Sequence, residues 1–296
     1  MSGTLLDAAL AGGTRTIVVV GTAKNVGKTV TFNALRAQAL RRGIVGAITS
    51  IGRDGEASDA LDGSHKPGVR VQPGTIIALP RELVPRSPAL HILDRGESSA
   101  LGPMIFARAR FAADCEIGGP PTARGVRATI DRLRELTSEP TFVDGAIDRI
   151  APLAGGDDAI VLATGAASAG SVAAIAELAR STIARLRLPG RDPGRERAPA
   201  IVVTGALDAR DAQELLATRP AATVVVADPT RIAVRGRLFD ALAAAFDLRC
   251  ERPLRVVACT TSSAGAGRAL DPRALVHAVA AATQLPTFDV VAGISA

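Results

Sequence analysis

The sequence predicts an α/β fold in which a parallel sheet is covered by helices on both faces. Short apolar runs rich in Val and Ile alternate with stretches of helical periodicity along both halves of the chain. The apolar share of 47% is mostly Ala, Val, Leu and Ile, with seven Phe and no Trp or Tyr. Such a composition suits helices packed on buried parallel strands. The 296 residues are enough for one large or two medium domains.

The elements follow from these runs in chain order. The strand predicted at 16–20 leads to a helix at about 29–42, which has Phe32, Leu35 and Leu40 toward one side and ends at Gly43. A second helix is predicted at 168–186, ended by Pro189-Gly190. Apolar runs predict the other strands at 44–49, 141–144, 159–163, 201–204, 223–226, 255–258 and 288–291.

The domain organisation is predicted from where this rhythm breaks. Prolines and glycines interrupt the stretch at about 55–125, which we interpret as an irregular, partly β insertion. A charged segment at 188–197 is interpreted as a linker. We therefore predict a first domain at 1–190 that carries the insertion, and a C-terminal α/β portion or second domain at 200–296.

The strand at 16–20 runs into the pattern Gly21-x4-Gly27-Lys28-Thr29, which opens the helix and is typical of the phosphate loop of P-loop NTPases. The chain has only three lysines among its 35 basic side chains, and two of them, Lys24 and Lys28, lie in this loop. Backbone N–H groups of such a loop cradle phosphates, the lysine reaches the β- and γ-phosphates, and the threonine hydroxyl binds Mg²⁺. The predicted ATP-binding residues are Gly21, Thr22, Ala23, Lys24, Asn25, Val26, Gly27, Lys28, Thr29 and Val30.

Acidic residues at the ends of neighbouring strands complete the predicted site. Asp144 follows the apolar strand at 141–144, and Asp54 follows the second strand with Glu56 close behind. We predict Lys28, Asp54 and Asp144 as catalytic residues, and Thr29, Asp54 and Asp144 as Mg²⁺ ligands. Arg53 and Arg149 are weaker candidates for neutralising charge in the transition state.

Several other functions are disfavoured by composition. The net charge of +6 comes from arginines that are interleaved with acids, and base-stacking Trp and Tyr are absent, so we expect no nucleic acid partner. Three unpaired cysteines and three scattered histidines suggest buried thiols rather than a zinc site or disulfides. No segment is apolar enough to span a membrane, and a cytoplasmic location is the simplest expectation.

The motifs resemble two families. Val18 to Val30 together with Val143-Asp-Gly-Ala146 resembles dethiobiotin synthetase, although this chain has Thr49-Ser50-Ile51 where that family keeps a Lys-Pro just after the second strand. Related ATPases often carry a signature lysine five positions before the P-loop lysine. In this chain that position is occupied by Ala23, and Lys24 lies one residue later. A closer resemblance, to the small ATPase subunit of the lysine 5,6-aminomutase reactivase, extends over most of the chain. It is carried by Ala23-Lys-Asn-Val-Gly-Lys-Thr29, Thr49-Ser-Ile-Gly-Arg-Asp-Gly-Glu56, Pro73-Gly-Thr-Ile77, Gly145-Ala-Ile-Asp-Arg149, Ala163-Thr-Gly-Ala166 and Ala227-Asp-Pro-Thr230.

The second resemblance implies a Mg²⁺-dependent ATPase that works with a larger actin-like or Hsp70-like subunit. Together the two subunits would release damaged cobalamin from a lysine or ornithine aminomutase that uses cobalamin and pyridoxal phosphate. Formation of a homodimer is left open. Two alternatives are an ATP-dependent ligase of the dethiobiotin synthetase type and a nucleotide-sensing scaffold that does not hydrolyse ATP.

Overall fold

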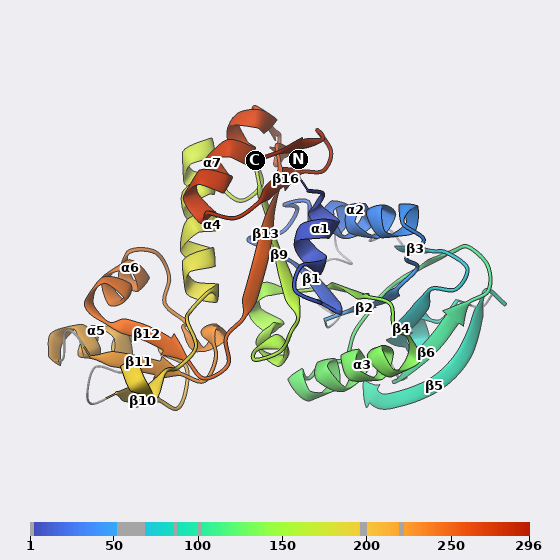
Figure 1. Ribbon diagram of the computed structural model, residues 1–296, viewed down its shortest axis with the longest axis horizontal. Helices are drawn as coiled ribbons and strands as arrows, with labels where there is room; N and C mark the ends of the chain where they lie inside the picture. The colour runs from blue at the N-terminus through green and yellow to red at the C-terminus, as the bar shows by residue number, and fades with distance from the viewer. Residues whose placement is uncertain (1–2, 52–68, 86–87, 100–101, 196–199, 219–221) are drawn as a thin grey trace. The chain divides into compact units, whose positions relative to one another are not determined.

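The computed structural model describes residues 3–51, 69–85, 88–99, 102–195, 200–218 and 222–296. Strands and helices alternate along these residues (Figure 1), and most strand pairs are parallel, which confirms the predicted α/β class. The chain divides into two compact units. The amino unit contains residues 3–20 and 28–152, and the carboxyl unit contains 21–27 and 153–296.

Six strands of the amino unit lie side by side in the order β1-β8-β2-β4-β6-β5. The first four are mutually parallel, whereas β6 and β5 are added antiparallel. A separate antiparallel pair joins β3 (Val69–Val71) to β7 (Ala113–Cys115). The six strands are β1 (Thr16–Gly21), β2 (Ala47–Ser50), β4 (Ile76–Pro80), β5 (Leu90–Ser99), β6 (Gly102–Ala109) and β8 (Thr141–Asp144).

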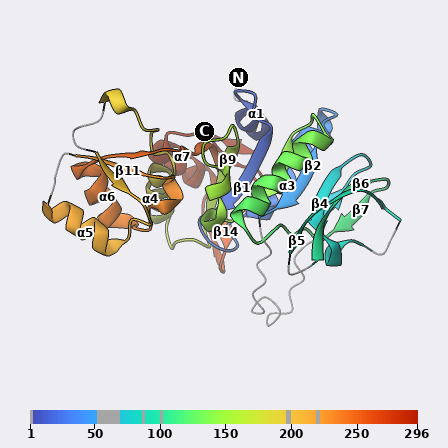
Figure 2. The same cartoon turned by 90° about the horizontal axis from the view of Figure 1, so that it is seen from below.

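Helices cover both faces of the amino unit's parallel strands, as predicted. α2 (Lys28–Arg41) and α3 (Ala123–Leu136) lie on opposite sides of these strands (Figures 1 and 2). Coverage on both sides explains why β1 is apolar without alternation, since residues 17–20 are all fully buried. The unit also contains α1 (Leu5–Leu10) and the short 3₁₀ turns η1 (Arg81–Leu83) and η2 (Ile147–Arg149). A further turn, η3 (Ala151–Leu153), starts in this unit and ends at the first residue of the next segment of the carboxyl unit.

The described part of the predicted insertion is β structure, which agrees with the prediction, but it is more regular than expected. The long antiparallel pair β5 and β6 extends the sheet, and Met104 and Phe106 of β6 pack in one cluster with Leu133 of α3. The helix α3 was not predicted. Gly125 in its first turn lowers helix propensity, and the helix is instead stabilised by burial of its apolar stripe.

The carboxyl unit contains four strands in the order β17-β16-β13-β9, of which all but β17 are parallel. Two helices, α4 (Val172–Leu186) and α7 (Pro272–Thr283), pack against each other and against these strands. The strands are β9 (Ala159–Gly165), β13 (Arg255–Ser262), β16 (Thr287–Asp289) and β17 (Ile294–Ser295), and a small hairpin of β14 (Ala264–Gly265) and β15 (Arg268–Ala269) follows β13.

A second parallel sheet in the carboxyl unit has the order β10-β11-β12. Phe239 and Leu242 of α6 are buried in its core. After residue 254 the chain returns to the first sheet of this unit, because β13 pairs with β9. The predicted domain division near residue 190 stays a prediction. The elements are η4 (Pro193–Arg195), β10 (Ile201–Val203), α5 (Ala209–Thr218), β11 (Thr223–Val226), η5 (Pro229–Arg231), α6 (Gly236–Ala245) and β12 (Asp247–Cys250).

None of the helices in the described ranges is long and apolar enough to cross a membrane.

Candidate functional site

The glycine-rich loop, residues 22–27 with Gly21 directly before it, joins β1 to α2. Asn25 and Gly27 both adopt left-handed conformations, with φ of 60° and 85°. A Cβ atom on Gly27 would lie only 3.1 Å from Cβ of Ser262, so the loop passes very close to the end of β13. Val26 is buried while Ala23, Lys24 and Asn25 are exposed. The loop is therefore anchored at Val26 and open to solvent from Ala23 to Asn25.

The start of α2 continues directly from this loop. The helix begins at Lys28, and the first four N–H groups of a helix have no acceptor within it. Together with the helix dipole, these groups make a helix start a favourable position for an anion. Thr29 is partly buried in the first turn, and Val30 is 47% exposed. The start of α2 is therefore suitable for binding an anion such as phosphate.

Lys28 and Asp144, both predicted catalytic residues, lie together in the amino unit. Nζ of Lys28 donates to the carbonyl oxygen of Gly145 at 3.0 Å and lies 3.7 Å from Oδ1 of Asp144. Both side chains are largely screened from solvent, with 28% and 13% of their surfaces exposed. The structure thus pairs the positive charge of the first residue of α2 with the acid at the end of β8.

The position of Asp144 follows from strand register. Asp144 ends β8, which lies between β1 and β2, and it is aligned with Val19 on one side and Ser50 on the other. The hydroxyl of Ser50 donates to the carbonyl oxygen of Asp144 at 3.1 Å, and N–H of Ile51 donates to the same oxygen at 2.9 Å. Because parallel strands end at a common edge, Asp144 reaches the same edge as the end of β1. Ser50 was not predicted as part of the site.

A Mg²⁺ ion would find few protein ligands at this site. No group of three or more His, Cys, Asp or Glu side chains that could hold a metal occurs within the described residues. Mg²⁺ commonly binds one or two protein oxygens and completes its shell with phosphate oxygens and water. Thr29, in the first turn of α2, and Asp144, which lies 3.7 Å from Lys28, each carry an oxygen of the kind that such a site uses.

Several of the residues named with the predicted site lie in a part of the chain that the structure does not describe. Asp54, Glu56 and Arg53 lie outside the described residues, as does the third lysine, Lys66. Arg149 is exposed at the end of η2. The roles of Asp54 in catalysis and in Mg²⁺ binding therefore stay predictions.

The three cysteines take no part in the site. Cys115, Cys250 and Cys259 are all free and buried, as the sequence predicted. Burial raises the pKa of the Cys115 thiol to about 11 and those of Cys250 and Cys259 to about 12. Thiols with such pKa values are protonated near neutral pH and are poor nucleophiles.

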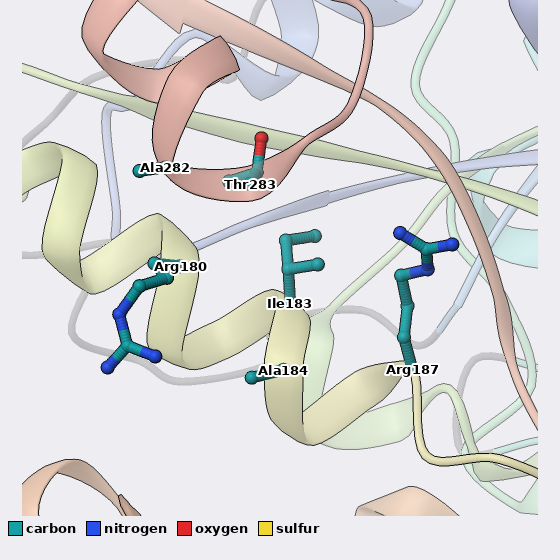
Figure 3. A pocket seen from close by; sticks show the side chains of 6 residues that line it. All are labelled: Arg180, Ile183, Ala184, Arg187, Ala282 and Thr283. Atoms are coloured by element: carbon teal, nitrogen blue, oxygen red, sulfur yellow. The ribbon is translucent and has the colours of Figure 1, made fainter.

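A small groove in the carboxyl unit lies between α4 and α7 (Figure 3). It has a volume of about 300 Å³ and includes none of the predicted site residues. One of its two arginines, Arg180, is already paired with Glu177 at 2.7 Å and with Asp240 at 3.1 Å. The groove is lined by Arg180, Ile183, Ala184, Arg187, Ala282 and Thr283.

Comparisons of this chain with protein-family models, with curated proteins and with solved structures found no match.

Proposed function

We propose that this chain is a Mg²⁺-dependent ATPase of the P-loop class. The observation that carries the proposal is the pairing of Lys28 with Asp144, at the point where a glycine-rich loop opens a helix. A lysine and an acid in this arrangement are the two charged groups that a P-loop NTPase needs for phosphate and metal. The left-handed residues Asn25 and Gly27 support the proposal, because they let the loop's backbone curl around an anion.

The proposed chemistry is hydrolysis of the γ-phosphate by water. Water forms a bond to the γ-phosphorus while the bond from that phosphorus to the β–γ bridging oxygen breaks, and ADP and phosphate are released. Lys28 would leave Asp144 to stabilise the charge on the β- and γ-phosphate oxygens. Thr29 and Asp144 would hold Mg²⁺, which supplies further charge neutralisation when bound. The absence of an Asn-Lys-x-Asp guanine motif in the sequence favours ATP over GTP.

The resemblance of the sequence motifs supports a more specific role for this ATPase. We propose that it serves as the small subunit of an aminomutase reactivase, and that it acts with a larger actin-like or Hsp70-like subunit on a cobalamin- and pyridoxal-phosphate-dependent mutase. Loop rearrangement on ATP hydrolysis would be coupled to release of damaged cobalamin by the partner. The exposed Lys24 in the loop is one candidate contact for either phosphate or that partner.

The first experiment measures ATP binding and phosphate release in the intact chain and in Lys28→Ala. We expect Lys28→Ala to lose nucleotide binding or turnover while its circular dichroism spectrum stays unchanged. Arg41→Ala is a matched control, because Arg41 is exposed in the last turn of the same helix. Unchanged hydrolysis in Lys28→Ala would disprove the proposed ATPase.

The second experiment separates the three functions that the sequence left open. Phosphate release is measured alone, with a reactivase large subunit and inactivated aminomutase, and with small amines or carboxylic acids. Stimulation only by the protein partners supports the reactivase. Dependence on a small amine or acid supports the ligase, and tight ATP binding with no turnover under any condition supports the scaffold.

A further inference from the structure

Thr22, the first residue of the glycine-rich loop, is held at two points by the end of β9. Its backbone N–H donates to the carbonyl oxygen of Ala163 at 3.0 Å, and its hydroxyl donates to Oγ1 of Thr164 at 3.1 Å. All three residues belong to the carboxyl unit. Because the N–H of Thr22 is engaged by β9, the loop's phosphate-facing N–H groups begin after Thr22.

The hydroxyl of Thr164 belongs to a chain of hydrogen bonds with a defined direction. Ser168 donates its hydroxyl proton to the carbonyl oxygen of Gly165 at 2.7 Å, and its Oγ lies 3.4 Å from Oγ1 of Thr164. Since a carbonyl oxygen only accepts, Ser168 uses its one hydroxyl proton there and must accept from Thr164. Thr164 in turn accepts from Thr22. Each of the three hydroxyls therefore donates once, in the order Thr22, Thr164, Ser168.

Thr164 occupies the middle of this chain and is fully buried. Removing its hydroxyl would take this acceptor away from the half-buried hydroxyl of Thr22 and this donor away from Ser168. Packing alone would not require a hydroxyl here, because a β-branched Val would fill a buried parallel strand equally well. The hydroxyl is thus suited to fixing the position of Thr22 rather than to building the strand.

We infer that Thr164 is a positioning residue for nucleotide binding, which acts through Thr22 to set the direction of the loop's phosphate-facing N–H groups. This inference rests on the proposed ATPase function. It concerns the affinity for the phosphates rather than the chemical step, because neither hydroxyl needs to contact the γ-phosphorus. Loss of one such hydrogen bond weakens binding by about tenfold when its free energy is realised fully.

The test measures the dissociation constant for MgATP by calorimetry, and kcat and KM for hydrolysis, in the full-length chain and in Thr164→Val. We expect Thr164→Val to raise the dissociation constant and KM about tenfold and to leave kcat within about twofold. Thr164→Ser keeps the hydroxyl and should restore wild-type affinity. Thr223→Val is the matched control, since Thr223 is a fully buried strand threonine whose hydroxyl bonds to Asp247 at 3.5 Å.

A double-mutant cycle with Thr22→Val keeps the test decisive if Thr164→Val folds poorly. Thr22→Val removes the same bond from the loop side, and the double variant should bind MgATP no more weakly than the weaker of the two single variants. Wild-type affinity in Thr164→Val or Thr22→Val, failed rescue by Thr164→Ser, or equal weakening in Thr223→Val would overturn the inference. A wild-type chain that binds no MgATP would overturn the proposed function, and this inference with it.

Discussion

Lys28 and Asp144 form an ion pair at 3.7 Å that connects the first residue of α2 to the last residue of β8. Lys28 also donates to the carbonyl oxygen of Gly145, the next residue after the acid. The two groups thus compensate each other's charge before any ligand binds. If a bound nucleotide's phosphate contacts Lys28 and Mg²⁺ contacts the carboxylate of Asp144, each side chain exchanges its contact with the other for a stronger one with the ligand.

Substitution of Asp144 should therefore separate binding from hydrolysis. We expect Asp144→Asn to reduce phosphate release roughly 100-fold or more, because loss of the metal ligand removes several kcal/mol of transition-state stabilisation. Binding of ATP without Mg²⁺ should not weaken, because Lys28 no longer has to leave a carboxylate. Phosphate-release assays and calorimetry with and without Mg²⁺ check these two results.

Asp131→Asn is the control for this substitution. Asp131 lies on α3 in the same unit, and its Oδ1 is also 3.7 Å from a cationic nitrogen, that of Arg127. Its side chain is 52% exposed, so the pair contributes little. Equal loss of hydrolysis in both variants would show that the effect of Asp144→Asn is not specific to the site.

Gly27 should be required both for loop conformation and for nucleotide binding. Its φ of 85° disfavours any residue with a Cβ by about 1–2 kcal/mol, and a Cβ there would press on Ser262. Gly27→Ala is expected to lower the free energy of unfolding by that amount and to weaken MgATP binding at least tenfold. Denaturant titration and calorimetry measure the two effects.

Gly43→Ala provides the comparison. Gly43 has a φ of 75° after the end of α2, but a Cβ there would meet no atom within 4 Å. We expect a similar loss of stability with no loss of MgATP affinity. Weaker MgATP binding in Gly43→Ala would mean that loss of stability, rather than loop geometry, explains the result for Gly27→Ala.

Much of the Lys28 site could be predicted from the sequence, because its residues are specified locally. The apolar runs that end at Gly21 and Asp144 predict strands β1 and β8, and the carboxyl ends of parallel strands share an edge. The spacing from Gly21 to Lys28 predicts the loop, and Gly43 with its positive φ marks where α2 ends.

The remainder depends on tertiary contacts that no local pattern encodes. The roles of Ser50 and Thr164 follow from strand register and from hydroxyl partners distant in the chain. Helix α3 contains a glycine in its first turn and is stabilised by packing of Ile130 and Leu133. Likewise, only the pairing of β13 with β9 shows that the chain returns to an earlier sheet after residue 254.

Asp228 should be a major source of stability in the carboxyl unit. Its fully buried carboxylate accepts from Arg252 at 3.1 Å and from the N–H of Thr230 at 3.0 Å. We expect Asp228→Ala to lower the free energy of unfolding by about 2 kcal/mol, because charge-assisted bonds to a buried group are lost. Asp228→Asn keeps an oxygen for Thr230 and should lose roughly half as much. Chemical denaturation measures both.

Asp240→Ala is the control for Asp228. Asp240 also lies 3.1 Å from an arginine, Arg180, but its side chain is 41% exposed. An exposed pair is worth little, so we expect a change below about 0.5 kcal/mol. A loss in Asp240→Ala as large as in Asp228→Ala would contradict the assignment of the effect to burial.

Cys259 should make the stability of the protein fall at alkaline pH. Burial raises the pKa of its thiol to about 12, although a hydrogen bond to Thr283 and the charge of Arg187 oppose this rise. In the unfolded chain the pKa of the thiol is about 8.5. Between these two values the folded state retains a proton that the unfolded state loses, so stability decreases as pH rises.

The expected decrease is at most about 1.4 kcal/mol per pH unit for this one thiol. Its contribution is fully present below the pKa of the unfolded chain and is lost as pH rises toward the folded pKa. Urea denaturation of the wild type and of Cys259→Ala at pH 8, 9, 10 and 11 measures it. Other titrating groups affect both proteins alike, and the cavity left by Cys259→Ala gives an offset that is independent of pH. The stability of the wild type relative to Cys259→Ala should therefore fall steadily above pH 9. Parallel curves up to pH 11 would show that the thiol ionises equally in both states.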